Sequence, residues 1–469
     1  INGDTRPDDL QENAIMVIGE SDGTFDSDDK IVFYGQGPHR WSMADSSSCM
    51  VFHHTKHLYS EKTFYFIKVG SGNGKRVQNQ VNADTPYNTV ATSFDDYNFF
   101  ESDNHNLLKS GREWYGQVLD ITTSQSVSFG FADRITAEPI KLRTNVVSRS
   151  IGIPSNFQFN VNGSEFAVTP SSVTGEYYQK YAETAISCQE INAGTSSVNI
   201  DLDFNKAVSN AQGWLDHVEV NVRRNLVYSG TELIFRDLQS VGVGKVTEFR
   251  LTNTGSSVSL WDVTDPINVR RQLVDQNGST QIFTISTESL REFAAFNGTG
   301  FKNVGLEGSV ENQNLHGLSQ ANMIIVSHGD FMSEAERLAD FHRNSDERSL
   351  SVHVVTPEEI YNEFSSGAQD ICAIRDFMRM FYERAGSNPS NIARYLLLFG
   401  DASYDYKDVL DGNTNFVPTF ESYESMLPTR SYASDDYFGM LDPSEGYWTA
   451  SSSDALDIGV GRFPVRTIG

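Results

Sequence analysis

The stretch that decides the fold is residues 323–336, which read MIIVSHGDFMSEAE. Residues 323–326 are a continuous apolar run, as expected for a strand buried on both faces of a sheet. Ser333 and Glu336 then have the spacing of a capping box, which predicts that a helix begins there. A buried strand followed directly by an amphipathic helix indicates a parallel sheet with helices on its faces.

The same alternation continues along the chain. Residues 352–355 (VHVV) are a second apolar run, and residues 356–359 (TPEE) repeat the capping signal with proline at the first helical position. YLLLF at 395–399 and IGV at 458–460 are two further strands. A longer helix lies between the second and third strands, with its apolar stripe at Ile371, Ile374, Met378 and Phe381. We expect one mostly parallel α/β unit.

The two ends of the sequence raise a separate expectation. The strand at 458–460 is expected to be buried on both faces of the sheet, but few residues follow it to supply covering helices. The α/β unit is therefore expected to be incomplete. Residue 1 is Ile and no apolar signal segment precedes it, so the N-terminus is expected to be cut as well.

The first three hundred residues have a different pattern. Short runs of Val, Ile, Phe, Tyr and Thr, such as 63–69, 126–131 and 218–222, alternate with Gly, Asn, Asp and Ser, which predicts antiparallel strands in β-sandwiches. Polar stretches near 71–88 and 305–317 are the expected joints. The predicted domains are a β-rich domain at 1–75, truncated at its N-terminus, a β-sandwich region at 76–312, and the α/β unit at 313–469.

Composition excludes several classes of protein. The 469 residues carry a formal net charge of −26, and an acidic surface repels phosphate, so nucleic-acid binding is not expected. No apolar run is long enough to cross a bilayer, so no transmembrane segment is expected. Cys49, Cys188 and Cys372 form no C-x-x-C pair, which argues against a zinc knuckle and leaves one disulfide open.

A cysteine–histidine dyad is the first candidate site. His328 follows the strand at 323–326, and ligands of open α/β sheets bind at that carboxyl edge. Cys372 is the only cysteine of the α/β unit, but it lies beside the apolar stripe of a helix, where a free cysteine is usually a small buried hydrophobe. We favour a strand-end loop histidine over a His328/Cys372 dyad.

Carboxylates at the same edge are the second candidate site. Asp401 follows the third strand, and Asp435 and Asp436 come later in the α/β unit, so they are expected to gather there. Their oxygens would suit a structural calcium ion. Aspartates also cap turns and helices, and capping is the favoured interpretation. No cofactor is expected to be required for catalysis.

A dense acidic loop near the N-terminus is a further calcium candidate. Asp22, Asp26 and Asp28 precede a predicted strand. The order differs from the EF-hand loop, which needs glycine after the third acidic ligand and not after the first. A solvated turn is therefore favoured over a calcium site.

Two tryptophans stand beside charged residues in the β-rich part. Trp114 follows Arg112 and Glu113, and Trp214 precedes Asp216. Each would serve either as a recognition surface or as an anchor that holds one β unit against another. The anchor is the favoured interpretation.

Four motifs, in this order along the chain, resemble the gingipain family of cysteine peptidases, and within it the cell-surface sortases of type IX secretion. They are 34–41 (YGQGPHRW), 110–116 (SGREWYG), 261–266 (WDVTDP) and 460–464 (VGRFP). The resemblance implies two caspase-like subdomains in series, with 398–401 (LFGD) and 458–463 (IGVGRF) matching the first. It also implies that the catalytic Cys and His-Gly lie in the second, beyond Gly469, so this chain alone is expected to be inactive.

The function implied by the resemblance is that of a peptidase and transpeptidase. Such an enzyme would sit on the extracellular face of the outer membrane of a Gram-negative bacterium, beside an outer-membrane partner from the secretion machinery. It would remove the C-terminal signal domain of secreted protein cargo and attach the cargo to the cell surface. The alternative is a non-catalytic surface adhesin or scaffold whose β-sandwiches bind a partner.

Overall fold

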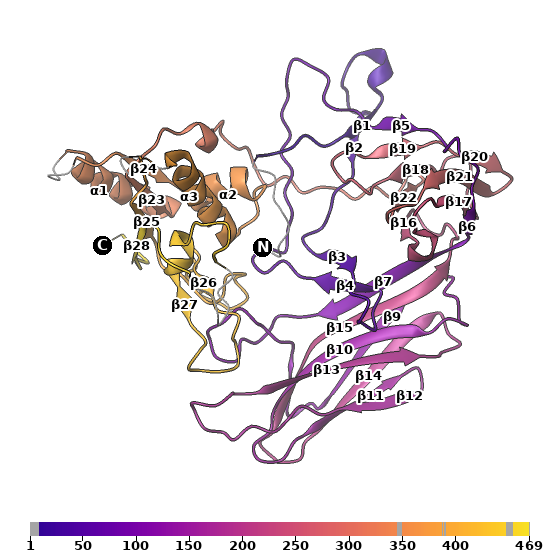
Figure 1. The fold of residues 1–469 in the computed structure, drawn as a ribbon, viewed down its shortest axis with the longest axis horizontal. Helices are drawn as coiled ribbons and strands as arrows, with labels where there is room; N and C mark the ends of the chain where they lie inside the picture. The colour runs from indigo at the N-terminus through magenta and orange to yellow at the C-terminus, as the bar shows by residue number, and fades with distance from the viewer. Residues whose placement is uncertain (1–8, 345–348, 387, 389–390, 447–453, 469) are drawn as a thin grey trace.

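The computed structural model describes residues 9–344, 349–386, 388, 391–446 and 454–468. A large β-rich part and a smaller α/β unit lie side by side, with the helices at the left of the view in Figure 1. Several antiparallel sheets precede one parallel sheet in the chain, which confirms the predicted fold class. No helix among the described residues has the length and apolar character needed to cross a membrane.

In the first sandwich, two sheets pack face to face around a shared hydrophobic core. One sheet contains, in spatial order, β13 (Glu183–Ile191), β10 (Ile140–Arg149), β15 (Gln212–Asn225) and β7 (Ser93–Glu101), with β8 (Val118–Leu119) also paired to β15. The other contains β12 (Ser164–Val168), β11 (Asn156–Val161), β14 (Ser197–Asn205) and β9 (Ser124–Gly130). Alternate residues such as Phe157 and Phe159 point into the shared core, because successive side chains of a strand face opposite ways.

The second sandwich continues one sheet of the first. β7 also pairs with β16 (Glu232–Arg236), and the sheet then runs on through β22 (Glu292–Phe296), β18 (Ser259–Asp262), β19 (Arg270–Gln272) and β5 (Gln78–Gln80). The second sheet contains β20 (Asp275–Asn277), β21 (Thr280–Ser286), β17 (Val246–Leu251) and β6 (Thr89–Ala91). A short helix, η2 (Leu238–Ser240), follows β16. The core of the second sandwich is centred on four phenylalanines, Phe235, Phe249, Phe283 and Phe293.

The N-terminal residues pack on the other parts of the chain, which differs from the separate domain predicted at 1–75. They form β1 (Ile15–Ile18), η1 (Glu20–Asp22), β2 (Lys30–Phe33), β3 (Arg40–Met43) and β4 (Phe52–Thr55). Met16 and Val32 pack on Trp261 of the second sandwich, whereas Tyr59 belongs to the core of the α/β unit. Two short hairpins enclose too little apolar surface to form a core of their own.

The predicted strand at 63–69 is not formed. Residues 63–69 have no strand assignment, and Ile67 and Val69 are 75% and 94% exposed. Tyr65 packs on Phe33. A run of β-branched and aromatic residues favours a strand only where a neighbouring strand accepts its hydrogen bonds, and the fold supplies none here. The predicted strands at 126–131 and 218–222 correspond to β9 and to part of β15.

The α/β unit has a four-stranded parallel sheet in the order β24-β23-β25-β28. Its strands are β23 (Met323–Ser327), β24 (Val352–Val355), β25 (Tyr395–Phe399) and β28 (Gly459–Phe463). The helices are η3 (Leu315–Gly317), η4 (Gly329–Phe331), α1 (Met332–Asn344), α2 (Pro357–Phe364), α3 (Ile371–Ala385) and η5 (Asp435–Gly439). A small hairpin of β26 (Phe420–Glu421) and β27 (Ala433–Ser434) precedes η5.

Helices cover both faces of this sheet. Ile324 and Val326 pack with Phe377 of α3, whereas Ile325 packs with Ala335 of α1. α2 also contributes to the first of these two cores. The sheet is therefore buried between α1 on one side and α2 and α3 on the other, as the alternation of strands and helices predicted.

Three local predictions have different outcomes. The capping box at Thr356 and Glu359 is present and opens α2. The one predicted at Ser333 is wrong, because η4 runs directly into α1 and places Ser333 inside the helix. The expectation that the last strand is buried on both faces is also wrong. Among the described strands β28 pairs only with β25, and its residues alternate between exposed and half-buried.

Candidate functional site

At the carboxyl edge of the parallel sheet, Asp401 follows β25 and Asp435 begins η5. Arg462 of β28 connects their surroundings, because it donates to both oxygens of Asp435 at 2.7 and 2.8 Å and to the carbonyl of Gly400 at 2.9 Å. Asp401 accepts from Arg466 Nε at 2.6 Å and from Thr414 Oγ1 at 3.0 Å. Each carboxylate is therefore paired with an arginine.

The calcium site predicted at this edge stays a prediction. Asp436 is exposed, and the amide of Asp436 bonds to Ser434, the N-cap of η5. A calcium ion needs six or more oxygen ligands, and here arginines occupy oxygens of Asp401 and Asp435. Among the described residues there is no group of three or more His, Cys, Asp or Glu side chains placed to hold a metal ion.

The acidic loop near the N-terminus bonds to its own backbone. Asp22 accepts from the amide and the hydroxyl of Thr24 at 2.9 and 3.0 Å, and these hydrogen bonds lower the pKa of Asp22 below its usual value. Asp26 accepts from the amide of Asp28 at 3.0 Å. These contacts are those of a turn, which was the favoured interpretation.

His328 and Cys372 have different surroundings. His328 is the N-cap of η4, where Nδ1 accepts from the amide of Asp330 at 3.3 Å and the ring packs on Phe416. Cys372 lies in the first turn of α3, and its Sγ is 2.9 Å from the hydroxyl of Tyr437. Cys372 is partly buried and packs against the core that α2 and α3 form, as expected for a structural cysteine.

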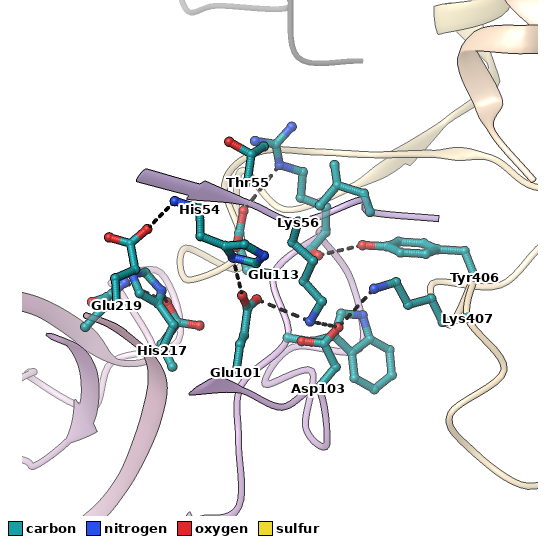
Figure 2. Close-up of a pocket in the computed structure, with 15 residues that line it drawn as sticks. His54, Thr55, Lys56, Glu101, Asp103, Glu113, His217, Glu219, Tyr406 and Lys407 are labelled. Atoms are coloured by element: carbon teal, nitrogen blue, oxygen red, sulfur yellow. Dashed lines mark hydrogen bonds and ion pairs between the residues drawn. The ribbon is translucent and has the colours of Figure 1, made fainter. Parts of the chain in front are cut away.

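A charged cavity of about 290 Å³ lies where three parts of the chain meet, and we call it the junction cavity (Figure 2). The end of the β3–β4 hairpin, the first sandwich and the loop after β25 all contribute to its walls. The residues that line it include His54, Lys56, Glu101, Asp103, Glu113, Asp216, His217, Glu219, Tyr406 and Lys407. Most of these residues are charged.

Two lysines bind one carboxylate in the junction cavity. Asp103 Oδ2 lies 2.5 Å from Lys56 Nζ and 3.4 Å from Lys407 Nζ, and Lys56 also lies 3.2 Å from Glu101. Burial by itself would lower the pKa of Lys56, but Glu101 and Asp103 raise it above its usual value. Lys56 therefore stays charged, and Asp103 connects the hairpin, the sandwich and the α/β unit.

Among the titratable side chains that the hairpin contributes to the junction cavity, that of His54 has the smallest exposed fraction. Its ring stacks on Phe99, with 3.5 Å between the ring centroids, and its amide donates to Glu219 at 2.8 Å. Nδ1 lies 3.8 Å from Glu101, and Nε2 is buried without a hydrogen-bond partner in the described part of the chain. Burial lowers the pKa of His54 to about 3, so the ring is neutral at physiological pH.

A disulfide and a shared acceptor hold the hairpin on the first sandwich. Cys49 and Cys188 form the one disulfide that the sequence left open, with 6.1 Å between their Cα atoms. Asn221 Oδ1 accepts from the amides of Val51 and Phe52 at 2.8 and 2.7 Å. The hairpin is thus fixed covalently on one side and by buried hydrogen bonds on the other.

The motif 110–116 forms the contact between the sandwich and the α/β unit. Trp114 stacks on Tyr404, and the guanidinium of Arg112 lies 3.4 Å above the ring of Tyr423. Trp214 is buried in a cluster with Met426. Both tryptophans are anchors, but they hold the first sandwich against the α/β unit and not one β unit against another, and the buried rings are inaccessible for recognition.

No direct signal in the sequence predicted that these side chains would meet in the junction cavity. Lys56, Asp103 and Lys407 are up to 351 positions apart, and none of them stands in a recognisable catalytic or metal-binding spacing. Only the neighbouring motif 110–116 pointed to this region. Tertiary packing alone brings these charges together.

Comparisons with known proteins bear on the whole chain and on the α/β unit separately. Residues 316–469 match the family profile of peptidase family C25. The crystal structure of dimeric latent PorU from Porphyromonas gingivalis superposes with a TM-score of 0.79 and 24% identity, covering 98% of this chain and 44% of that one. This chain therefore spans less than half the length of PorU.

We call residues 316–469, which match this family profile, the C25 segment. At 24% identity, the likeness to PorU shows that the chain as a whole shares its fold. No curated protein sequence matches the chain.

Two carbohydrate-binding modules are also similar to short parts of the chain. One is a CBM36 domain of a xylanase from the hindgut metagenome of Trinervitermes trinervoides, at 12% identity over 27% of this chain and 96% of that one. The other is a CBM36 module in complex with calcium and xylotriose, at 14% identity over 26% and 98%. Both have TM-scores of 0.18, which carry no argument here.

Two motifs of the C25 segment lie side by side in its sheet. In the parallel pairing of β25 with β28, Leu398 is opposite Arg462 and Phe399 is opposite Phe463. Beyond the strands, the amide of Gly400 donates to the carbonyl of Phe463 at 3.0 Å. The stretches LFGD and VGRFP therefore belong to one structural unit, which accounts for their joint occurrence in the C25 segment.

Proposed function

We propose that this chain is part of a cell-surface cysteine endopeptidase and transpeptidase of type IX secretion. The observation that carries the proposal is the similarity in fold to latent PorU over 98% of the chain, together with the C25 match at 316–469. The four motifs found in the sequence support it. The protein would act on the extracellular face of the outer membrane, beside an outer-membrane partner of the secretion machinery.

The proposed reaction is removal of the C-terminal signal domain from secreted cargo. A cysteine thiolate would attack the peptide bond and form an acyl-enzyme, which an amine on the cell surface or water would then resolve. Such a thiolate needs a neighbouring base to lower its pKa. Cys372 is the one cysteine of the described residues outside the disulfide, and its sulfur contacts a tyrosine hydroxyl beside a packed core.

We therefore propose that residues beyond Gly469 supply the catalytic cysteine and histidine. In this proposal the described chain has a supporting role. The sandwiches and the junction cavity hold the C25 segment in place, and no bond is broken by the side chains described above. A structural calcium ion at Asp22, Asp26 and Asp28 or at Asp401, Asp435 and Asp436 remains an untested part of the proposal.

The experiment compares the 469-residue chain with a polypeptide extended beyond Gly469, each incubated with cargo that carries its C-terminal signal domain. Only the extended polypeptide is expected to cleave or ligate the cargo, and Cys372→Ala in it is expected to leave turnover unchanged. Turnover by the 469-residue chain that disappears in Cys372→Ala would overturn the proposal. Cargo binding without cleavage by the extended polypeptide would favour the alternative of a non-catalytic scaffold.

A further inference from the structure

A buried carboxylate lies in the contact between the first sandwich and the C25 segment. Glu421 stands at the end of β26 and is 1% exposed. The strand β26 lies on the side of the α/β unit nearer to the first sandwich (Figure 1). Glu421 Oε2 accepts from the amide of Gly111 at 2.7 Å. Among the described residues this is the only hydrogen bond to its carboxylate.

The backbone at Gly111 lies very close to Ser425 of the C25 segment. A Cβ on Gly111 would lie 2.5 Å from Ser425 Oγ, and Gly111 has a φ of +80°. The adjacent amides of Arg112 and Glu113 donate to the carbonyl of Ser422 at 3.2 Å and to Ser425 Oγ at 3.1 Å. Glu421 is therefore enclosed by a tight, hydrogen-bonded contact that leaves no room for a hydration shell.

The charged and titratable groups around Glu421 interact with partners other than its carboxylate. On the sandwich side, Arg112 lies over the ring of Tyr423 and pairs with Glu113 at 3.3 Å. On the C25 side, Tyr406 donates its hydroxyl to the carbonyl of Arg112 at 2.6 Å. Glu424 accepts from the amides of Met426 and Leu427 at 2.9 and 3.0 Å. No cation bonds to the carboxylate of Glu421 among the residues described.

A buried carboxylate with one neutral donor is far more costly when charged than when protonated. Burial raises the pKa of Glu421 from 4.5 to about 7, and the Gly111 amide offsets only part of that effect. In an undocked state the side chain would be hydrated and would titrate near its usual value. The protonated form therefore favours the docked state, and the charged form favours the undocked state.

We propose that Glu421 makes the docking of the C25 segment on the first sandwich pH-dependent, so that the contact weakens as the carboxyl loses its proton. Because the docked state has the higher pKa, the contribution is fully present below pH 4.5 and is lost as the pH rises to about 7. Above that pH the loss levels off, since both states are then charged. The proposal concerns domain docking and does not depend on the proposed catalysis.

The test measures amide hydrogen exchange in peptides that cover 105–116 and 420–432, at pH 5 and pH 7.5, after correction for the intrinsic exchange rate. Peptides from β14 in the sandwich core are the internal reference. In the wild type the opening constant of the contact is expected to rise by about tenfold per pH unit between pH 5 and 7. Glu421→Gln keeps the acceptor oxygen without the charge, so its protection is expected to be high at both pH values.

Glu424→Gln is the matched control. Its carboxylate lies in the same loop but already accepts two amides, so it should retain the pH dependence of the wild type. Equal protection of the wild-type contact at pH 5 and 7.5, relative to β14, would overturn the proposal. The same loss of protection in Glu421→Gln would also overturn it. The wild-type profile alone decides the matter if Glu421→Gln does not fold.

Discussion

Lys407 Nζ of the C25 segment lies 3.4 Å from Asp103 Oδ2 of the first sandwich, and both side chains are largely buried. Lys56 of the N-terminal hairpin binds the same oxygen at 2.5 Å. One carboxylate thus connects three parts of the chain that are distant in sequence. A charge pair of this kind is costly to break on one side only, because the remaining charge stays buried.

This connection predicts strong coupling between Lys407 and Asp103. In a double-mutant cycle of Lys407→Met and Asp103→Asn, we expect a coupling energy of about 1–3 kcal/mol in the free energy of unfolding. Denaturant unfolding measures it. The exposed pair Lys62 and Glu307, 2.9 Å apart, is the control and should show little coupling, because water screens it. Equal coupling in the two cycles would contradict the role given to Asp103.

Because His54 is buried in its neutral form, we expect the folded chain to lose stability in acid. Its pKa in the folded chain is about 3, below the usual 6.5, so its contribution is present above pH 6.5 and is lost as the pH falls towards 3. His54→Phe keeps an aromatic ring beside Phe99 but cannot take a proton. Between pH 7 and pH 4 the variant should lose less unfolding free energy than the wild type, by roughly 2 kcal/mol. Identical acid profiles would show that His54 is accessible to protons in the folded state.

The Cys49–Cys188 disulfide predicts a particular pattern among variants. The two residues are 139 positions apart, so the bond closes a long loop, and its removal should cost roughly 2–5 kcal/mol of unfolding free energy. Cys49→Ser, Cys188→Ser and the double variant should be equally destabilised, because each removes the same bond. Thermal unfolding with and without reductant checks this. Additive effects of the two single variants would count against a disulfide between them.

We expect the two arginines at the sheet edge, Arg462 and Arg466, to differ in how much they contribute to the free energy of unfolding. Arg462 binds both oxygens of Asp435 and the carbonyls of Gly400 and Val417, and it is 11% exposed. Arg462→Met should therefore cost about 3–5 kcal/mol, since it leaves a partly buried carboxylate without its partner. Arg466→Met is the control, because Arg466 is 67% exposed and pairs only with Asp401 among the described residues. That change should cost less, about 1 kcal/mol, because Arg466 is solvated and Asp401 keeps the hydrogen bond from Thr414 Oγ1. Similar losses in thermal stability would refute the distinction.

The parallel sheet could be predicted from the sequence because its signals are local. Thr356 and Glu359 are three residues apart, and the side chain of each accepts a hydrogen bond from the backbone amide of the other at the start of α2. The apolar runs of β23 and β25 can likewise be recognised without knowledge of a distant partner. Residues 63–69 have an equally strong strand signal, yet they remain unpaired. A strand is completed by its neighbours, so its own composition is insufficient evidence.

The candidate site was less predictable, for a related reason. Asp401 and Asp435 were placed correctly at the sheet edge, because strand ends are local features. Their arginine partners Arg462 and Arg466, which leave little capacity for a cation, were not anticipated. Apart from Glu113 of the motif 110–116, the cavity side chains named above belong to no motif, and their proximity depends on how three separate parts pack.

The sequence by itself determined the order of β-rich and α/β parts, the parallel sheet with its helices, and the resemblance to the gingipain family. These follow from side-chain periodicity and from short motifs, which act over a few residues. Only the tertiary structure decided that the N-terminal residues lie across both sandwiches and the C25 segment. It also decided that Lys56, Asp103 and Lys407 share one cavity and that Glu421 is buried against Gly111. Burial and charge pairing depend on distances between residues far apart in the chain, and those distances exist only once the chain has folded.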